Sequence, residues 1–282
     1  MNQFWISDGC IKISYHTLRT VARCPYEFEL VNIQGRKPVF ETRRFLIANI
    51  IDLSLSDWIN TGFMVDGLVS IVSNRYVRYT EDNYIRWKSL SDKEEQRKLA
   101  VEVATNMERQ MREAGMCRQG VASTQDRLNT RFENVILTGR PDLVYHDTLE
   151  LYDLKTTENN VWMDWDQLVY YSMVLSWQKG KRFKKIGFLV PMMSNPIQIK
   201  EGLEEDMASE DDGDNRPFQG AWLKTVDKIR KVADTIKSGN FPAVVGDHCY
   251  MCLSKDNCKY FKSSLNKPVQ FVQIGGKVKV SL

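Results

Sequence analysis

Long hydrophobic runs are missing from this sequence of 282 residues. No apolar stretch approaches the roughly 20 residues needed to cross a bilayer, and the N-terminus lacks the charged and then apolar layout of a signal peptide. We therefore expect a soluble, cytoplasmic protein with no membrane partner. Histidine is scarce too: there are three, and a lone histidine is more often structural than catalytic. A hydrophobic content of 43% is ample for one large domain or two small ones.

Basic residues are absent from one segment. Glu201 to Asp214 contains eight acidic residues and neither Lys nor Arg, so the rest of the chain carries a net charge of +11 against +3 for the whole. A body of that charge favours a polyanionic partner, although solvated Lys-rich faces are ordinary. The acidic segment itself has the composition of a loop.

Two β-rich runs, 134–145 and 148–156, flank the turn-like pair His146-Asp147 and predict a hairpin. Side chains on a strand alternate between faces, so Asp153 and Lys155 share one face of the second strand. Asp142 lies on the neighbouring strand, where it can meet Asp153 across the pair.

Two carboxylates side by side repel each other unless a cation lies between them. Oxygen ligands of this kind suit magnesium or manganese, and such an ion lowers the pKa of the water that it binds. Lys155 would point at the same place and orient that water, or neutralise charge as a phosphodiester is attacked. The alternative is a hairpin with a structural Asp-Lys pair, because motifs this short also occur by chance.

The segment 164–179 has a helical pattern and is followed by Gly180, a residue typical of helix C-caps. Gln167 and Tyr171 are four residues apart and therefore share a face of this helix. Their polar tips can flank the site that the two strands create.

Together these residues carry a resemblance. Gly139-Arg-Pro-Asp142, Asp153-Leu-Lys155-Thr and Gln167-x-x-x-Tyr171, in this order and spacing, resemble the motifs of the PD-(D/E)XK nuclease superfamily, and most of all its RecB-like exonuclease branch. The resemblance implies that Asp142 and Asp153 bind the metal with help from the carbonyl oxygen of Leu154. It also implies that Lys155 is catalytic and that Gln167 and Tyr171 support the site or touch DNA.

One position departs from the family pattern. In RecB-like relatives an early helix carries a histidine that joins the metal site, whereas the best-aligned residue in the helix predicted for 42–60 is Asn49. An asparagine offers a neutral oxygen to a hard cation, but not the strength or the proton chemistry of an imidazole. Three interpretations stay open: a neighbour such as Asp52 substitutes, the site is weakened, or the alignment is shifted and Asn49 is a plain surface residue.

Basic and aromatic residues interleave between positions 74 and 88. Bases stack on aromatic faces while Arg and Lys meet phosphates, a combination that suits single-stranded nucleic acid. The alternative is a helical subdomain with partly buried aromatics and a solvated charged face. The candidate nucleic-acid contacts are Arg75, Tyr76, Arg78, Arg86 and Trp87.

Three of the six cysteines, Cys249, Cys252 and Cys258, form the pattern C-x2-C-x5-C. In an intracellular protein such close spacing indicates a metal site, with ordinary buried thiols as the alternative. Cys24 can supply a fourth ligand if the two ends of the chain meet. Four thiolates fit either zinc or an iron-sulfur cluster, and the spacing does not separate the two.

A second resemblance bears on that choice. One remote N-terminal cysteine with three clustered C-terminal ones, preceded by Gly239-Asn-Phe-Pro242, resembles the iron-sulfur nucleases, which include the CRISPR-associated exonuclease and helicase-linked RecB-like domains. The resemblance implies a [4Fe-4S] cluster that pins the two chain ends together around the nuclease core. Zinc stays the alternative.

We therefore expect an α/β fold with a PD-(D/E)XK restriction-endonuclease-like core, in which helices flank a mixed central sheet, together with a helical insertion and an iron-sulfur clasp. The expected parts are an N-terminal segment with one cluster cysteine, a helical region, the nuclease core, an acidic loop, and a C-terminal helix with the cysteine cluster and tail. Their bounds are 1–41, 42–120, 121–200, 201–216 and 217–282.

The activity implied by the resemblance is that of a Mg²⁺- or Mn²⁺-dependent DNA exonuclease. It would act on single-stranded DNA or DNA ends in recombination, repair or replication, with helicase or recombination proteins as partners. The alternative belongs to another class: a catalytically weak or inactive DNA-binding module that keeps the same fold.

Overall fold

The computed structural model describes the chain in stretches, and it divides the chain into two compact units. The first unit comprises Met1–Phe40, Arg131–Ile136 and Val226–Leu282, and the second comprises Glu41–Thr130 and Leu137–Thr225. Of the predicted acidic loop 201–216, only Glu201 lies within the described residues, and Arg86 lies outside them. The described residues are 6–7, 10–36, 46–63, 67–83, 85, 87, 89–156, 163–193, 197–201, 218–252, 254–264, 270–274 and 277–281.

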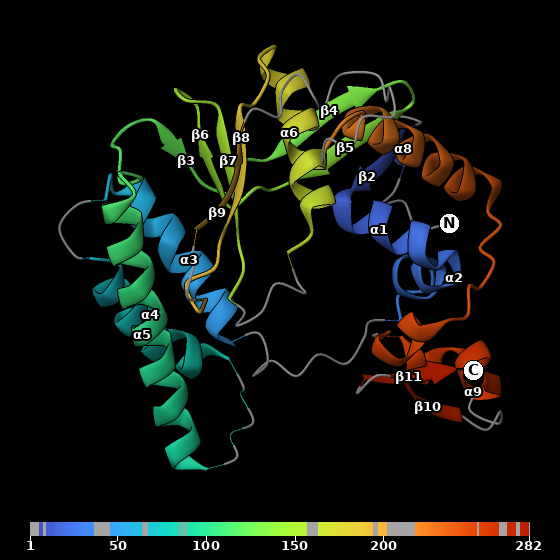
Figure 1. Ribbon diagram of the computed structural model, residues 1–282, viewed down its shortest axis with the longest axis horizontal. Coiled ribbons are helices and arrows are strands. Elements are labelled where there is room, and N and C mark those ends of the chain that lie inside the picture. Colours follow the sequence, from blue (N-terminus) through green and yellow to red (C-terminus); the bar gives the residue numbers. More distant parts are fainter. Residues whose placement is uncertain are drawn as a thin grey trace. The chain divides into compact units, whose positions relative to one another are not determined.

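A five-stranded sheet of order β3-β6-β7-β8-β9 forms the centre of the second unit (Figure 1). Strands β7 and β8 are parallel, and the other neighbours are antiparallel. The sheet is therefore mixed, as the family resemblance implied. Its strands are β3 (Ala122–Ser123), β6 (Leu143–Tyr145), β7 (Glu150–Leu154), β8 (Lys185–Leu189) and β9 (Ile197–Glu201).

Helices pack on this sheet. Helices α3 (Leu46–Asn60), α4 (Leu68–Asp82) and α5 (Leu90–Glu113) lie side by side (Figure 1). Their buried apolar side chains form one core with Leu143, Tyr145 and Tyr152 of the sheet. Helix α6 (Trp165–Lys179) packs against β7 and β8 and ends, as predicted, at a left-handed Gly180. Because side chains alternate along a strand, Asp153 faces away from the side on which Tyr152 packs.

The predicted hairpin is correct in its second strand and wrong in its first. The run 134–145 is not one strand: β5 (Val135–Gly139) belongs to a four-stranded sheet and β6 to the five-stranded one, with a break at residues 140–142. Pro141 explains the break, because its nitrogen carries no hydrogen for a strand ladder. Leu149, which we expected inside the second strand, lies in the turn with φ of +58°.

The first unit contains the two chain ends. Ser14 is the N-cap of helix α1 (Tyr15–Arg23), and its hydroxyl accepts a hydrogen bond from the Thr17 amide at 3.1 Å. The hairpin of β4 (Leu128–Phe132) and β5, which the two units share, completes a sheet of order β1-β2-β5-β4. The other elements are β1 (Ile6–Ser7), β2 (Cys10–Ser14), α2 (Pro25–Phe28), a π-helical turn (Glu29–Ile33), most of α8 (Ala221–Ser238), 3₁₀ turns (Asp247–Met251 and Lys255–Asn257), α9 (Lys259–Ser264), and the hairpin of β10 (Gln270–Ile274) and β11 (Lys277–Ser281).

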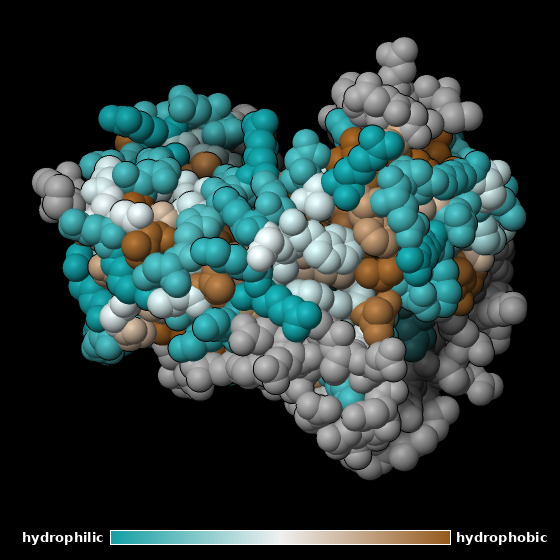
Figure 2. Space-filling view, turned by 90° about the horizontal axis from the view of Figure 1, so that it is seen from above, coloured by the Kyte–Doolittle hydropathy of each residue, from teal (hydrophilic) through white to brown (hydrophobic). Residues whose placement is uncertain are grey.

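The described helices give no membrane span: none of them is both long and apolar enough to cross a bilayer. In the space-filling view, hydrophobic residues appear as small separate patches among hydrophilic ones (Figure 2).

Candidate functional site

The end of β7 brings two acidic side chains together. Asp142 stands immediately before β6, and the antiparallel register of β6 with β7 sets it beside Asp153. The carboxylate of Asp142 accepts a hydrogen bond from the backbone amide of Leu154 at 2.7 Å. Asp153 is buried, with 3% of its surface exposed. The two predicted metal ligands therefore meet, although Asp142 precedes a strand instead of lying within one.

Lys155 and helix α6 close over these carboxylates. The Lys155 ammonium forms an ion pair with Asp153 and donates to Oε1 of Gln167 at 3.3 Å. The amide nitrogen of Gln167 donates to Asp153 at 3.0 Å and to the hydroxyl of Tyr171 at 3.3 Å. The i, i+4 spacing on α6 thus places Tyr171 behind Gln167, and Gln167 in contact with both the acid and the amine.

Gly139 allows Tyr171 to take this position. A Cβ atom at residue 139 would lie 2.6 Å from Cε1 of the Tyr171 ring, a separation that no ordinary side chain tolerates. Burial raises the pKa of Tyr171 to about 12, with Asp153 contributing in the same direction. The hydroxyl therefore keeps its proton at neutral pH and acts as a hydrogen-bonding group.

Helix α3 adds a third carboxylate that the sequence offered only as one alternative. Asp52 lines the same cavity as Asp142 and Asp153, and its carboxylate accepts a hydrogen bond from the amide of Gln125 at 2.8 Å. Asn49, one turn earlier on α3, also lines this cavity. We call this space, with a volume of about 330 Å³, the carboxylate cavity. Its size lies in the range of ligand-binding pockets.

Burial and mutual repulsion raise the pKa values of the three carboxylates. Burial raises the pKa of Asp142 well above its ordinary value, and the charges of Asp153 and Asp52 raise it further. Burial also raises the pKa of Asp153, against the opposing effect of Lys155. The pKa of Asp52 is raised by burial and then by Asp153. Lys155 and the exposed Arg140, which also lines the cavity, do not balance three carboxylates, and a divalent cation would relieve the repulsion.

The donor atoms of the carboxylate cavity fit a hard cation. Carboxylate oxygens from three residues, with the backbone of Leu154 beside them, are the ligand type of Mg²⁺ and Mn²⁺. Among the described residues, however, no group of three or more His, Cys, Asp and Glu side chains already has the arrangement of a metal site. Side-chain rotation would have to accompany binding, and Lys155 would have to share Asp153 with the ion.

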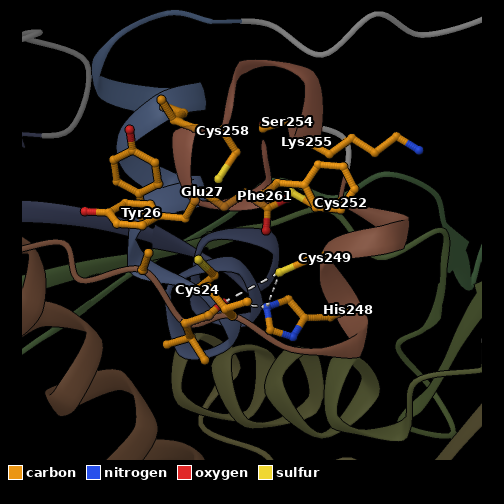
Figure 3. A pocket seen from close by; sticks show the side chains of 15 residues that line it. Cys24, Tyr26, Glu27, His248, Cys249, Cys252, Ser254, Lys255, Cys258 and Phe261 are labelled. Carbon is orange, nitrogen blue, oxygen red and sulfur yellow. Dashed lines mark hydrogen bonds between the residues drawn. The ribbon is translucent and has the colours of Figure 1, made fainter. Parts of the chain in front are cut away.

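The four predicted cysteine ligands line one pocket of the first unit, which we call the cysteine pocket. Figure 3 shows their sulfur atoms pointing into the same space, from residues Cys24, Cys249, Cys252 and Cys258. Cys24 lies between α1 and α2, and the other three lie in and after the 3₁₀ turns near the C-terminus. The spacing in the sequence thus identified a set of thiols that the fold gathers.

The donor atoms of the cysteine pocket are soft, although its described thiols do not already have the arrangement of a metal site. The amide of Gly246 donates to the sulfur of Cys249 at 3.4 Å. Burial raises the pKa of Cys252 to about 12, and the neighbouring carboxylate of Glu27 raises it as well. This thiol therefore stays protonated until a cation takes the place of its proton. Four sulfur donors fit zinc and an iron-sulfur cluster equally.

Glu27 is a feature of the cysteine pocket that sequence reasoning missed. Its side chain is buried, lines the pocket and pairs with Arg23 at 2.5 Å. The signal was present, because Arg23 and Glu27 are four residues apart and carry opposite charges. The charge of the buried Glu27 carboxylate beside Cys252 is therefore balanced by the guanidinium of Arg23.

The predicted nucleic-acid residues have different environments in the second unit. Arg75 forms an ion pair with Asp57 on α3. Tyr76 is 1% exposed, and its hydroxyl donates to the carbonyl oxygen of Lys93 at 2.6 Å. Trp87 packs partly against the core, and Arg78 is exposed. Because Tyr76 is buried, it has no face on which a base can stack.

Comparison with known protein families gives a match over most of the chain. A family model described as the PD-(D/E)XK nuclease superfamily matches residues 12–259. Among solved structures, one described as "Crystal structure of SSO0001" is similar with a TM-score of 0.33 and 16% sequence identity, covering 78% of this chain and 96% of that chain. No curated protein matches the chain. The family match spans both the carboxylate cavity and the four cysteines of the cysteine pocket.

Proposed function

This chain belongs to the PD-(D/E)XK nuclease superfamily, and we propose that it is a Mg²⁺- or Mn²⁺-dependent deoxyribonuclease. The proposed reaction is exonucleolytic hydrolysis of phosphodiester bonds in single-stranded DNA or at DNA ends, in recombination, repair or replication. One observation carries the proposal: Asp142, Asp153 and Lys155 meet in one cavity within the matched region. Helicase or recombination proteins are the partners that such a role implies.

Oxygen donors would hold the ion. Asp142, Asp153 and the carbonyl oxygen of Leu154 are the proposed ligands, and Asp52 is a further anionic donor facing the same cavity. When bound, the ion lowers the pKa of a water ligand and stabilises negative charge on the phosphate. Asp52 is the better substitute for the missing histidine, because Asn49 is neutral and its amide nitrogen donates to the hydroxyl of Tyr79 at 3.1 Å.

Lys155 is the proposed catalytic residue. Its ammonium, held by Asp153 and Gln167, is placed to orient the attacking water and to neutralise charge that develops on the phosphate. Gln167 is then a positioning residue, because one amide fixes both the acid and the amine. Tyr171 accepts from the same amide and so holds it in orientation.

The four thiols of the cysteine pocket are the proposed ligands of a [4Fe-4S] cluster with a structural role, and zinc is the alternative. Cys24 and the C-terminal cysteines are far apart in the sequence, so any shared metal group joins the two chain ends within the first unit. Absorbance at about 400 nm would indicate an iron-sulfur cluster. Zinc analysis of the same sample would reveal the alternative metal.

A second candidate function is a DNA-binding module with weak or no catalysis. Asn49, where the resemblance led us to expect a histidine, is the observation that favours it. This candidate keeps the DNA-binding surface and loses metal-dependent cleavage.

One experiment separates the two functions. Single-stranded DNA labelled at the 5′ or the 3′ end is incubated with the protein and Mg²⁺ or Mn²⁺, with EDTA as the control for metal dependence. We expect progressive shortening that Asp153→Ala and Lys155→Ala abolish. Lys179→Ala, an exposed lysine on the same helix as Gln167, is the matched control and should cleave at the wild-type rate. Full cleavage by the Lys155 variant, or none by the wild type, would refute the proposal.

A further inference from the structure

A second cavity of the second unit opens along helix α4, and we call it the α4 cavity. Ile71, Asn74, Arg78 and Tyr79 line it, spaced so that they form one stripe on the helix. Asn83, the residue that ends α4, lines it as well. Arg75 and Arg78, two of the predicted nucleic-acid contacts, line it too.

The α4 cavity and the carboxylate cavity meet at one hydrogen bond. Asn49 lines the carboxylate cavity and Tyr79 lines the α4 cavity. The side-chain amide of Asn49 donates to the hydroxyl of Tyr79 at 3.1 Å. An extended ligand that passes this pair of side chains would reach both cavities.

Charge decides which part of a nucleotide suits the α4 cavity. Four charged side chains line it, two basic and two acidic: Arg75, Arg78, Asp57 and Asp82. Arg75 is already neutralised by its ion pair with Asp57. A site without net positive charge is a poor receptor for a phosphate and an acceptable one for a neutral, flat group.

The remaining lining has the chemistry that recognises a nucleobase. The ring of Tyr79 is partly buried against the core and also lines the cavity, so it is a fixed surface for stacking. The amides of Asn74 and Asn83 each offer a donor and an acceptor to the edge of a base. Asn83 is held in place because its amide nitrogen donates to the backbone carbonyl of Tyr79 at 2.9 Å.

We propose that the α4 cavity binds one unpaired base of the DNA strand whose phosphate lies in the carboxylate cavity. The inference rests on the proposed function, because it assigns that strand to the carboxylate cavity. Tyr79 stacks on the base, Asn74 and Asn83 contact its edge, and Arg78 lies at the rim near the backbone. A base in a duplex cannot enter without leaving its partner, so this site selects single-stranded DNA.

The test compares two fluorescein-labelled single strands of equal length and charge, one with all its bases and one abasic throughout. Their dissociation constants are measured by anisotropy in Ca²⁺, an oxygen-ligated divalent cation that supplies the positive charge the carboxylate cavity needs to hold a phosphate, and a gel of the same samples verifies that the strands stay uncut. The wild type should prefer the strand with bases, and Tyr79→Ala should reduce that preference on the order of tenfold, the usual effect of losing one aromatic stacking partner. Tyr79→Phe keeps the ring and should keep the preference.

Val77→Ala is the matched control, since Val77 is exposed on the same helix and does not line the α4 cavity. The proposal is overturned if Tyr79→Ala retains the full preference, or if the wild type binds both strands equally or neither. Its failure is distinct from failure of the proposed function. If the protein cleaves DNA with a metal but Tyr79→Ala keeps the preference for bases, the base site is wrong and the nuclease assignment stands. If Tyr79→Ala loses the preference but the wild type cleaves no DNA, the base site stands and the nuclease assignment is wrong.

Discussion

Replacing Asp52 by asparagine is expected to stabilise the metal-free protein at neutral pH and to weaken its binding of Mn²⁺. Burial, followed by the charge of Asp153, raises the pKa of Asp52. A carboxyl group whose folded pKa is raised contributes stability below its unfolded pKa, and that contribution is lost as the pH rises through the folded pKa. At neutral pH the ionised group therefore opposes folding. Asparagine has the same shape, carries no charge and still accepts from Gln125.

The size of the effect follows from the repulsion that the substitution removes. Two like charges about 5 Å apart repel each other by about 3 kcal/mol at an effective dielectric constant of 20. Asp52 is only half-buried, so solvent screening reduces the gain to about 1 kcal/mol. For a protein of this size, that free energy corresponds to a rise of about 2–4 °C in melting temperature.

The assay is thermal unfolding of both proteins between pH 3.5 and 8, in EDTA and in excess Mn²⁺. In EDTA the gain of Asp52→Asn should be present at pH 7 and vanish below the ordinary aspartate pKa of 3.8. In Mn²⁺ the order should reverse, because the wild type has one more anionic ligand. Asp57→Asn is the control: Asp57 is an exposed residue of α3 that pairs with Arg75. Lower stability of Asp52→Asn in EDTA at pH 7, or a Mn²⁺ response equal to that of the wild type, would refute the reasoning.

Three further substitutions test the arrangement around each site. Gln167→Ala should lower the cleavage rate by about 10- to 100-fold, because the amine and the acid lose their common anchor, while the melting temperature stays within about 2 °C of the wild type. Gly139→Ala should cost about 1–3 kcal/mol of unfolding free energy in a denaturant titration, because its Cβ would overlap the ring of Tyr171. Cys24→Ser should lose most of the bound iron or zinc in elemental analysis, whereas Cys117→Ser, which is outside the cysteine pocket, should bind as much metal as the wild type.

The central part of the site could be predicted because it depends on local geometry. The alternation of β7 decides where Asp153 points, and the helical spacing of α6 decides that Gln167 and Tyr171 share a face. Both rules depend on only a few neighbouring residues. They hold wherever the strand or the helix forms, whatever packs against it. The residues of the motif therefore meet in the structure as their order in the sequence suggested.

The strand break could not be read from the apolar pattern. Residues 134–145 look like one β-run because their composition is uniform, and Pro141 by itself also occurs at edge strands. What divides the run is pairing with distant segments, since β5 joins β2 and β4 whereas β6 joins β3 and β7. Propensity gives no account of such long-range partners.

The sequence also could not decide whether Asn49 or Asp52 takes the place of the expected histidine, because long-range partners determine the roles of these two side chains. Positions three apart on a helix face the same way, so the sequence allows both residues to reach the carboxylate cavity, and both do. Their roles differ because their neighbours differ: Tyr79 of α4 takes the amide of Asn49, and Gln125 holds the carboxylate of Asp52. Those partners lie 30 and 73 positions away in the chain.

The raised pKa values of the carboxylates connect folding to the proposed chemistry. Burying Asp142, Asp153 and Asp52 in one cavity costs stability when all three are ionised, because burial and mutual repulsion raise their pKa values. The same repulsion supplies part of the free energy with which a divalent cation binds, because the ion removes it. Protons compete for the same oxygens, so metal affinity must fall as the pH falls. A site built from well-compensated carboxylates would be more stable without its ion and would bind that ion less tightly.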